Sequence, residues 1–365
     1  GWNRETFALA LAIQNLFWGA GQPIAGAFAD RYGTARVLAL GALVYGIGLV
    51  CMAYAESSLA LHLTGGVMIG LGMSAASFSL VLAAFGRIVT PEKRSIAFGI
   101  GTAAGSMGQF VFSPISIELL ESFGWQNSLL ILGATLSIIV MLAPFLRGRR
   151  VVEANADGTA NQTFTQALSE AFGHRSYNLL VAGFFVCGFQ VAFIGVHLPA
   201  YLTDVGLDAK WGAWAIAMIG LFNVIGALAS GVISGRYSKA HFLVWIYLIR
   251  AVVMAAFLMF PITPTTVMIF SASMGLLWLS TVPPTSGLVV NMFGPQYMAT
   301  LFGFVFFSHQ IGSFLGVWLG GKLYDTMGNY DMVWYMAIAL SVFAGIVHWP
   351  ISDKAVVRKA VPQGA

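Results

Sequence analysis

The chain has 365 residues, of which 58% are hydrophobic and 9% are charged, whereas an average soluble domain has about 25% charged residues. This composition excludes a water-soluble surface and indicates a protein that crosses a membrane many times. The formal net charge of +4 does not indicate a nucleic-acid partner, and the two cysteines, both in apolar runs, provide neither a disulfide framework nor a paired-cysteine metal or redox site.

Uncharged runs of about 20 residues predict membrane-crossing helices, because backbone polar groups in lipid must be hydrogen-bonded within their own segment. In chain order we predict eleven spans, at 7–29, 37–55, 59–86, 95–119, 127–146, 177–203, 211–235, 241–260, 265–290, 297–323 and 331–350. The span at 265–290 contains Pro283 and Pro284. Each proline lacks a backbone donor, so we expect a break that makes this helix a bent gate.

Basic residues alternate between loops in a way that predicts orientation. With residue 1 placed outside, most of the 18 basic residues fall in inside loops, and only Arg4 and Lys210 fall in outside loops. This follows the positive-inside rule. It predicts a multi-pass protein of the cell inner (plasma) membrane with a cytoplasmic C-terminus.

An internal repeat relates the two halves of the chain. Shifts of 204 or 205 residues pair Gly26 with Gly231, Arg31 with Arg236, Gly99 with Gly303 and Gly108 with Gly312. The second half has a span ahead of Gly206, whereas the chain begins at the equivalent Gly1. We therefore expect the natural protein to have one further N-terminal helix, giving two parallel repeats of six helices.

This repeat predicts an all-α integral membrane protein with four parts. They are an N-terminal bundle of helices 2 to 6 at 1–146, a cytoplasmic linker at 147–176, a C-terminal bundle of helices 7 to 12 at 177–350, and a cytoplasmic tail at 351–365. The linker is the only long polar stretch, and it is basic at its start.

The residues from Gly26 to Arg36 read G-A-F-A-D-R-Y-G-T-A-R at the inside end of the first span. This motif resembles the signature loop of the major facilitator superfamily, G-x-x-x-D-R-x-G-x-x-R. The resemblance implies two six-helix bundles and a secondary transporter that works by alternating access. It also implies that Asp30, Arg31 and Arg36 form a gating latch. The alternative is that these charges only follow the positive-inside rule. That rule explains basic residues at the inside surface, but it does not require the carboxylate of Asp30. The second copy of the motif has Gly235 at the equivalent position.

Several further segments resemble the monocarboxylate-porter-like branch of that superfamily. They are the Gly-Trp-Asn-Arg start of the chain, the Pro-Ala-Tyr-Leu sequence from Pro199, the Ser-His-Gln-Ile-Gly sequence from Ser308, and Tyr324 with Asp325. The branch implies a small organic anion as substrate, moved together with a proton. Two sequence motifs typical of drug antiporters are incomplete in this chain. One is altered at His62, and the other is altered in the stretch that contains Gly101, Gly105 and Gly108. The glycines of that stretch, with Gly99, otherwise indicate close helix packing.

Ionisable residues inside membrane spans are rare, so each is a candidate for the transport site. Arg250 lies about nine residues into its span, or roughly 14 Å at 1.5 Å per residue. It suits an anionic substrate, but in the superfamily the ninth helix is an outer helix, so Arg250 could instead tie helix ends together. His309 and Gln310 lie mid-span, and His197 lies in the outside half of its span. A histidine there is either a proton carrier or a hydrogen-bonded core residue.

The other candidates for substrate binding are polar or aromatic residues of spans that resemble cavity-lining helices. They are Ser74, Ser77, Gln109, Gln190, Asn223, Trp278 and Thr281. Each could equally be an interhelical hydrogen-bonding or packing residue.

A polytopic enzyme is the competing class, but the chain has no GxSG, GxGD, HExxH or Walker A motif. We predict no enzyme activity, no cofactor and no metal. The expected partners are the substrate, a proton and the lipid bilayer, and the expected state is a monomer. Two alternatives stay open, which are an efflux carrier for hydrophobic or other small solutes and a sensor that kept the transporter scaffold.

Overall fold

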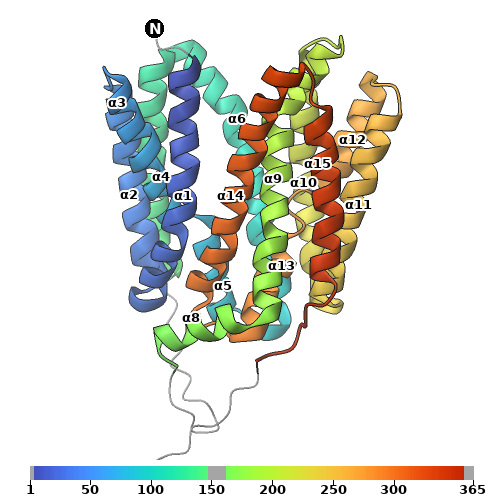
Figure 1. The fold of residues 1–365 in the computed structure, drawn as a ribbon. Helices are drawn as coiled ribbons and strands as arrows, with labels where there is room; N and C mark the ends of the chain where they lie inside the picture. The colour runs from blue at the N-terminus through green and yellow to red at the C-terminus, as the bar shows by residue number, and fades with distance from the viewer. Residues whose placement is uncertain (1–3, 147–161, 357–365) are drawn as a thin grey trace, which may run out of the picture.

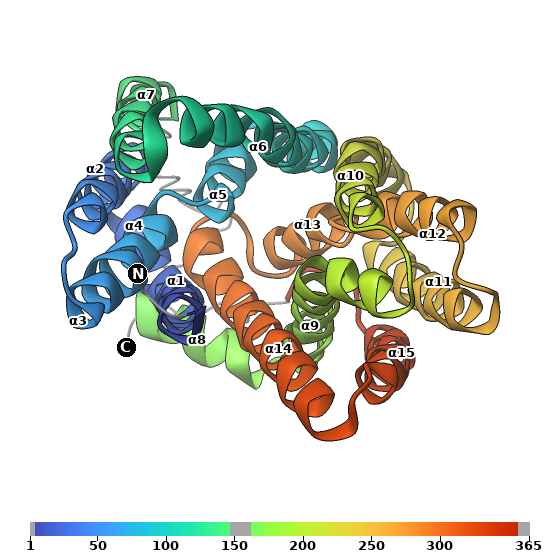
Figure 2. The same ribbon diagram turned by 90° about the horizontal axis from the view of Figure 1, so that it is seen from above.

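The computed structural model describes residues 4–146 and 162–356, and all regular structure within these residues is helical. The long helices run roughly parallel and form two neighbouring groups of consecutive helices (Figures 1 and 2). The predicted all-α class is confirmed.

The first group is built from the helices that precede residue 147. They are α1 (Arg4–Tyr32), α2 (Thr34–Ala53), α3 (Ser58–Leu61), α4 (Ile69–Ala75), α5 (Phe78–Ile88), α6 (Pro91–Thr135) and α7 (Ser137–Leu142). A π-helical segment, His62–Met68, joins α3 to α4, and a 3-10 turn, Ala143–Leu146, follows α7. Helix α6 is interrupted at Gly124, whose φ of 72° suits a residue without a Cβ. This interruption lies between the predicted spans 95–119 and 127–146.

The second group follows a short helix, α8 (Phe164–Gly173). It comprises α9 (Arg175–Asp204), α10 (Lys210–Arg236), α11 (Lys239–Met259), α12 (Pro264–Leu277), α13 (Val282–Phe293), α14 (Met298–Met327) and α15 (Asp331–His348). Seen from above, α14 lies beside α1 and α10 lies beside α6, so these pairs join the two groups (Figure 2).

Within the described residues, nine helical segments are long and apolar enough to cross a membrane. They correspond to nine of the predicted spans. The other two, 7–29 and 95–119, lie within α1 and the first part of α6, which are long helices but are not among the nine. The count of eleven and the additional N-terminal helix therefore stay predictions.

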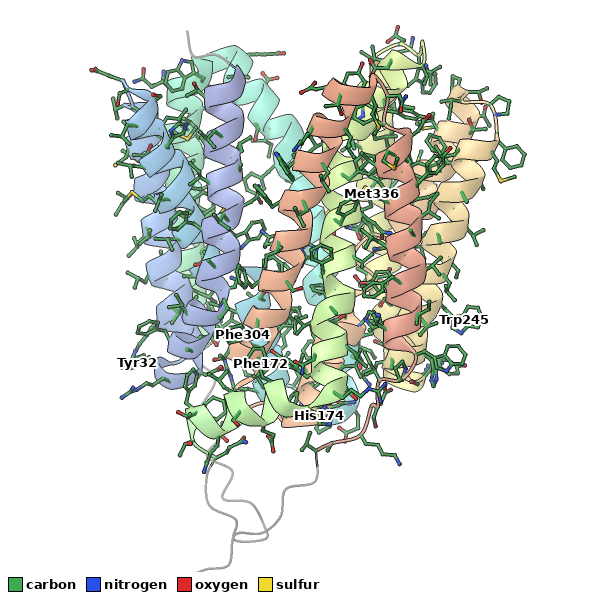
Figure 3. The ribbon with its side chains drawn as sticks, in the orientation of Figure 1. Tyr32, Phe172, His174, Trp245, Phe304 and Met336 are labelled. Atoms are coloured by element: carbon green, nitrogen blue, oxygen red, sulfur yellow. The ribbon has the colours of Figure 1, made fainter. Side chains whose placement is uncertain are left out.

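The predicted linker, 147–176, contains the helix α8, which lies across one end of the bundle (Figure 1). Thr163 and Gln166 form a capping box that begins α8. Phe172 of α8 packs against Phe304 of α14 with ring centroids 5.1 Å apart (Figure 3). We call this end of the bundle the α8 end; residues 147–161 lie outside the described part.

The expected break before Pro283 is confirmed, because α12 ends at Leu277 and α13 begins at Val282. Pro283 and Pro284 cannot donate to the carbonyl groups four residues earlier, so a continuous helix is lost just ahead of them. The first half has a comparable break between α4 and α5, where Ala76 and Ser77 leave helical geometry.

Candidate functional site

Asp30, near the end of α1, joins the two halves at the α8 end. Its carboxylate accepts hydrogen bonds from the backbone N–H groups of Ala299 (3.3 Å) and Thr300 (2.8 Å) and from the Thr300 hydroxyl (2.7 Å). Ala299 and Thr300 lie in the first turn of α14, where N–H groups have no partner within the helix and the helix dipole is positive. A side chain of the first half thus caps a helix of the second half.

Arg87, near the end of α5, completes this contact. Its Nη1 lies 2.8 Å from Asp30 Oδ1, the side chains are 7% and 1% exposed, and Arg87 also donates to the hydroxyl of Thr34. Arg31 and Arg36, which the motif places in the latch, are exposed instead, and Arg31 lies over the ring of Tyr32. The buried cation that partners Asp30 is therefore Arg87.

Glycines allow two close helix crossings at equivalent positions of the repeat. A Cβ on Gly26 of α1 would lie 2.3 Å from the carbonyl oxygen of Ala299 in α14. A Cβ on Gly231 of α10 would lie 2.8 Å from the carbonyl oxygen of Ser95 and from the Cα of Gly99, both in α6. Small residues let helix backbones approach in this way. The two halves therefore meet through two equivalent crossings.

Other glycines of α6 and α10 lie beside open space. A Cβ on Gly105 or Gly108 of α6, or on Gly220 of α10, would find no heavy atom within 4 Å. The expectation of close helix packing is thus confirmed for Gly99 and for Gly101. A Cβ on Gly101 would lie 2.9 Å from the side chain of Leu82. The same expectation is wrong for Gly105 and Gly108. A close approach of the α6 and α10 backbones is therefore shown at Gly99 and Gly231.

Ser74 and Ser77 lie at the break between α4 and α5, where Gln22 of α1 binds them. The Gln22 amide donates to the carbonyl of Ser74 and to the hydroxyl of Ser77 (2.9 Å), and all three residues are buried. The amide thus satisfies backbone and side-chain groups that the break leaves open. This arrangement corresponds to the interhelical alternative for both serines.

Asn223 of α10 bridges the two halves near the other break. Its Nδ2 donates to the hydroxyl of Ser106 in α6 (2.8 Å), and its Oδ1 accepts from the backbone N–H of Leu279 between α12 and α13 (3.0 Å). The side chain is 1% exposed. Asn223 therefore links α6 of the first half to the break between α12 and α13 of the second.

Arg250 of α11 is fully buried and is engaged by groups of its own half. Its guanidinium donates to the carbonyls of Leu277 (2.6 Å) and Trp278 and to Oε1 of Gln190 (3.1 Å). The carbonyls belong to the end of α12, where a positive charge is favoured by the helix dipole. Gln190 in turn donates to Ser341 of α15 (2.6 Å). This geometry favours the scaffold alternative for Arg250.

His309 and Gln310 lie in α14, where it contacts both α1 and α9. Nδ1 of His309 lies 3.2 Å from Oε1 of Gln310, and the two residues are 8% and 5% exposed. The His309 ring stacks on Phe306 of α14 (5.3 Å between centroids) and packs against Phe184 of α9 (5.0 Å). This is a buried polar pair between the halves, about 17 Å from the start of the helix at 1.5 Å per residue.

A thiol and a hydroxyl lie beside the guanidinium of Arg250. Sγ of Cys187 lies 3.2 Å from the Thr281 hydroxyl and 3.8 Å from Nη2 of Arg250. Both side chains are fully buried, so Thr281 has no access to a cavity in this conformation. A thiol, a hydroxyl and a guanidinium thus lie together beside the break between α12 and α13.

The last three predicted residues are His197, Trp278 and Gln109. Nε2 of His197 lies 2.9 Å from the carbonyl of Val317, and the ring packs against Phe193 and Tyr330. The Trp278 side chain belongs to the apolar core of the second half. Gln109 lies on α6, but its side chain is outside the described part. No group of His, Cys, Asp and Glu residues in the described part could hold a metal ion.

A family model described as Major Facilitator Superfamily matches residues 1–317. The chain belongs to the Major Facilitator Superfamily. It is 25% identical to monocarboxylate transporter 13 of Rattus norvegicus over 90% of this chain and 75% of that protein. It is 24% identical to the MFS-type transporter YcxA of Bacillus subtilis over 96% of this chain and 87% of that protein. Its fold is similar to that of the E. coli fucose:proton symporter FucP, with a TM-score of 0.75, 16% identity, and 96% and 92% of the two chains covered.

Membership in the Major Facilitator Superfamily confirms the predicted class, a multi-pass membrane transporter rather than an enzyme. The motif from Gly26 to Arg36 identified the family correctly. It did not identify Arg87, Thr300 or Gln22, which lie in no recognisable motif. In the sequence, Arg87 is recognisable only as a charged residue near the end of an apolar helix. Gln22 is recognisable only as a polar residue within an apolar span.

Proposed function

We propose that this major facilitator protein is a secondary active transporter of a small organic anion of the monocarboxylate class, moved together with a proton. The single observation that carries the proposal is the buried pair of His309 and Gln310 between the two halves. Arg250 is the only Lys or Arg deep in a predicted span, and it is engaged by carbonyl groups, so a mobile positive charge near the site would come from His309. The similarity to monocarboxylate transporter 13 supports the same class of substrate.

We propose that the bundles at 1–146 and 177–350 rock against each other around this pair. The contacts of Asp30 with α14, and of Gly99 with Gly231, close the α8 end. The positive-inside distribution assigns that end to the cytoplasm, with the C-terminus on the same side of the cell inner (plasma) membrane. The conformation described here is then closed to the inside, and transport requires both crossings to separate.

We assign different roles to the predicted substrate-binding residues. His309 and Gln310 contact the substrate. Ser74, Ser77, Asn223 and Thr281 hold the helix breaks, and Gln190, Trp278 and Arg250 support the bent gate. His197 and Gln109 stay candidates for the wall of the substrate path. The protein acts as a monomer, because each monomer contains both halves of the path.

The test is uptake into proteoliposomes containing the purified full chain. Pyruvate, lactate and benzoate are compared with their neutral amides, with and without a pH gradient. We expect uptake of at least one carboxylate, acceleration when the outside is acidic, and loss of that acceleration with a protonophore. Uptake of neutral or cationic compounds without any carboxylate would instead support the efflux carrier, and absence of all transport would support the sensor.

A further inference from the structure

Two buried N–H groups near the contact of α1 with α14 have no hydrogen-bond acceptor. They are the indole Nε1 of Trp18 and the amide Nε2 of Gln310. A polar group buried without a partner is costly, particularly in a membrane protein, so native structures keep few of them. Two such donors at one contact between the halves suggest that a ligand supplies the acceptor.

The two donors belong to one cluster of side chains. The ring of Trp18 lies 5.3 Å from the ring of Phe306, which precedes Gln310 by about one helical turn. A Cβ on Gly19, the neighbour of Trp18, would lie 2.7 Å from Cβ of Gln310. Phe78 of α5 packs on the other side of Phe306, with ring centroids 5.5 Å apart. We call Trp18, Phe78, Phe306, His309 and Gln310 the α1–α14 cluster.

His309 determines which end of the Gln310 amide stays free. Nδ1 of His309 lies 3.2 Å from Oε1 of Gln310, and the Ser313 hydroxyl donates to the same oxygen over 3.4 Å. With Oε1 occupied, the amide has only its N–H groups left for another partner. His309 therefore also orients the amide of Gln310.

The chemistry of the cluster selects a carboxylate. Its two unpaired groups, the N–H groups of Trp18 and Gln310, are donors, and none of its five side chains is acidic. A carboxylate offers only acceptors, whereas an alcohol or an amide would bring its own N–H or O–H group into the same donor-rich place. The aromatic rings around the donors suit an apolar remainder. The guanidinium of Arg250 is already bound to carbonyl groups, so it does not offer a positive charge to the second carboxylate of a dicarboxylate.

We propose that Trp18 and Gln310 together bind the carboxylate of the substrate, and that this site selects monocarboxylates with a small apolar remainder over dicarboxylates. The proposal rests on the transport function proposed above and adds the residues that recognise the anion. Trp18 lies on a helix of the first half and Gln310 on a helix of the second. A carboxylate bound by both would therefore connect the two halves where they separate during transport.

The test is equilibrium binding of pyruvate, lactate and benzoate to the purified full chain, each compared with its neutral amide and with succinate as the dicarboxylate. Trp18→Phe removes one N–H and keeps an aromatic ring, and Gln310→Met removes the amide and keeps a similar length. Trp334→Phe is the matched control. Its Nε1 is also buried without a partner, but it lies in α15 among Phe193 and Phe270.

We expect each cluster variant to weaken carboxylate binding about tenfold or more, since hydrogen bonds to charged groups are the stronger ones. Amide binding should change little, and Trp334→Phe should bind the carboxylate like the parent chain. Without ligand, Trp18→Phe should unfold at a temperature no lower than the parent chain, because only an unpaired donor has been removed.

Three results would overturn the proposal, and they separate its failure from that of the transport function. If the cluster variants bind the carboxylate as the parent chain does, the site is wrong while the function stands. If Trp18→Phe unfolds at a clearly lower temperature without ligand, the indole N–H already has a partner and the site is wrong. If the parent chain binds and transports no monocarboxylate, the proposed function fails and the site fails with it.

Discussion

Asp30 and Thr300 lie 270 positions apart, yet Oδ2 of Asp30 accepts hydrogen bonds from both the backbone N–H (2.8 Å) and the hydroxyl (2.7 Å) of Thr300. The contact joins the end of α1 to the start of α14, and thus the first half to the second. Helix-capping geometry of this kind normally occurs within one helix. Here it holds two bundles together at the α8 end.

Replacing Asp30 by Asn should release this contact and impair transport. The variant loses the charge that partners Arg87 and leaves a buried guanidinium unpaired, a change that costs about 3–5 kcal/mol in buried pairs. We expect easier labelling of cysteines introduced at the α8 end, together with slower uptake in proteoliposomes. Asp208→Asn is the control, because Asp208 and its partner Lys210 are 60% and 61% exposed. Unchanged labelling and uptake in Asp30→Asn would show that this contact does not control access.

Replacing Gly99 by Val should prevent full closure of the α8 end. The Cβ alone would lie 2.8 Å from Cα of Gly231 and 2.9 Å from the carbonyl oxygen of Ala227. Overpacking of this kind destabilises a packed contact by about 1–3 kcal/mol, and here the destabilised state is the closed conformation. Labelling at the α8 end should therefore increase as in Asp30→Asn.

The matched control for Gly99→Val lies on the same helix. Gly105→Ala adds a Cβ where no atom lies within 4 Å, and alanine favours a helix by about 0.5–1 kcal/mol over glycine. We expect normal uptake and equal or higher thermal stability. If Gly99→Val also transports normally, the close crossing is not needed for the transport cycle.

Replacing Arg250 by Met should destabilise the second half rather than alter substrate affinity. The carbonyls of Leu277 and Trp278 and the amide oxygen of Gln190 would lose their donor inside the membrane. Each unsatisfied buried group costs about 1–3 kcal/mol, so we expect a clearly lower unfolding temperature in detergent. Lysine should not restore it, because a single ammonium cannot reproduce the guanidinium fork. A stable Arg250→Met protein that no longer binds carboxylate would return Arg250 to the substrate site.

Replacing His309 by Gln should uncouple the anion from the proton. A glutamine at position 309 can still form a hydrogen bond with the amide of Gln310. Unlike histidine, it does not gain or lose a proton in the physiological pH range. We expect exchange of unlabelled for labelled carboxylate to continue, while acceleration of uptake by a pH gradient is lost. His241→Gln is the control, because His241 is exposed at the start of α11 and bonds only locally to Ser238. Acceleration that persists in His309→Gln would place the proton carrier elsewhere.

The sequence alone determined the class of molecule, because its signals are local. Apolar runs long enough to cross a membrane predict helices wherever the rest of the chain lies, and Pro283 and Pro284 break a helix because they lack N–H groups. The motif around Asp30 identified the family for the same reason. The shift that pairs Gly26 with Gly231 also predicted that the two halves are alike, and their crossings with α14 and α6 follow that repeat.

The tertiary structure decided which of the predicted residues share a site. Asp30 is bound by Arg87 and Thr300 rather than by Arg31 or Arg36, and Arg250 is bound by the carbonyls at the end of α12. No periodicity encodes these pairs, since each depends on how helices distant in sequence pack and rotate. A helix break exposes carbonyl and N–H groups that any nearby donor or acceptor can satisfy. Only packing decides that Arg250 fills this role, while Trp18 and Gln310 keep donors free.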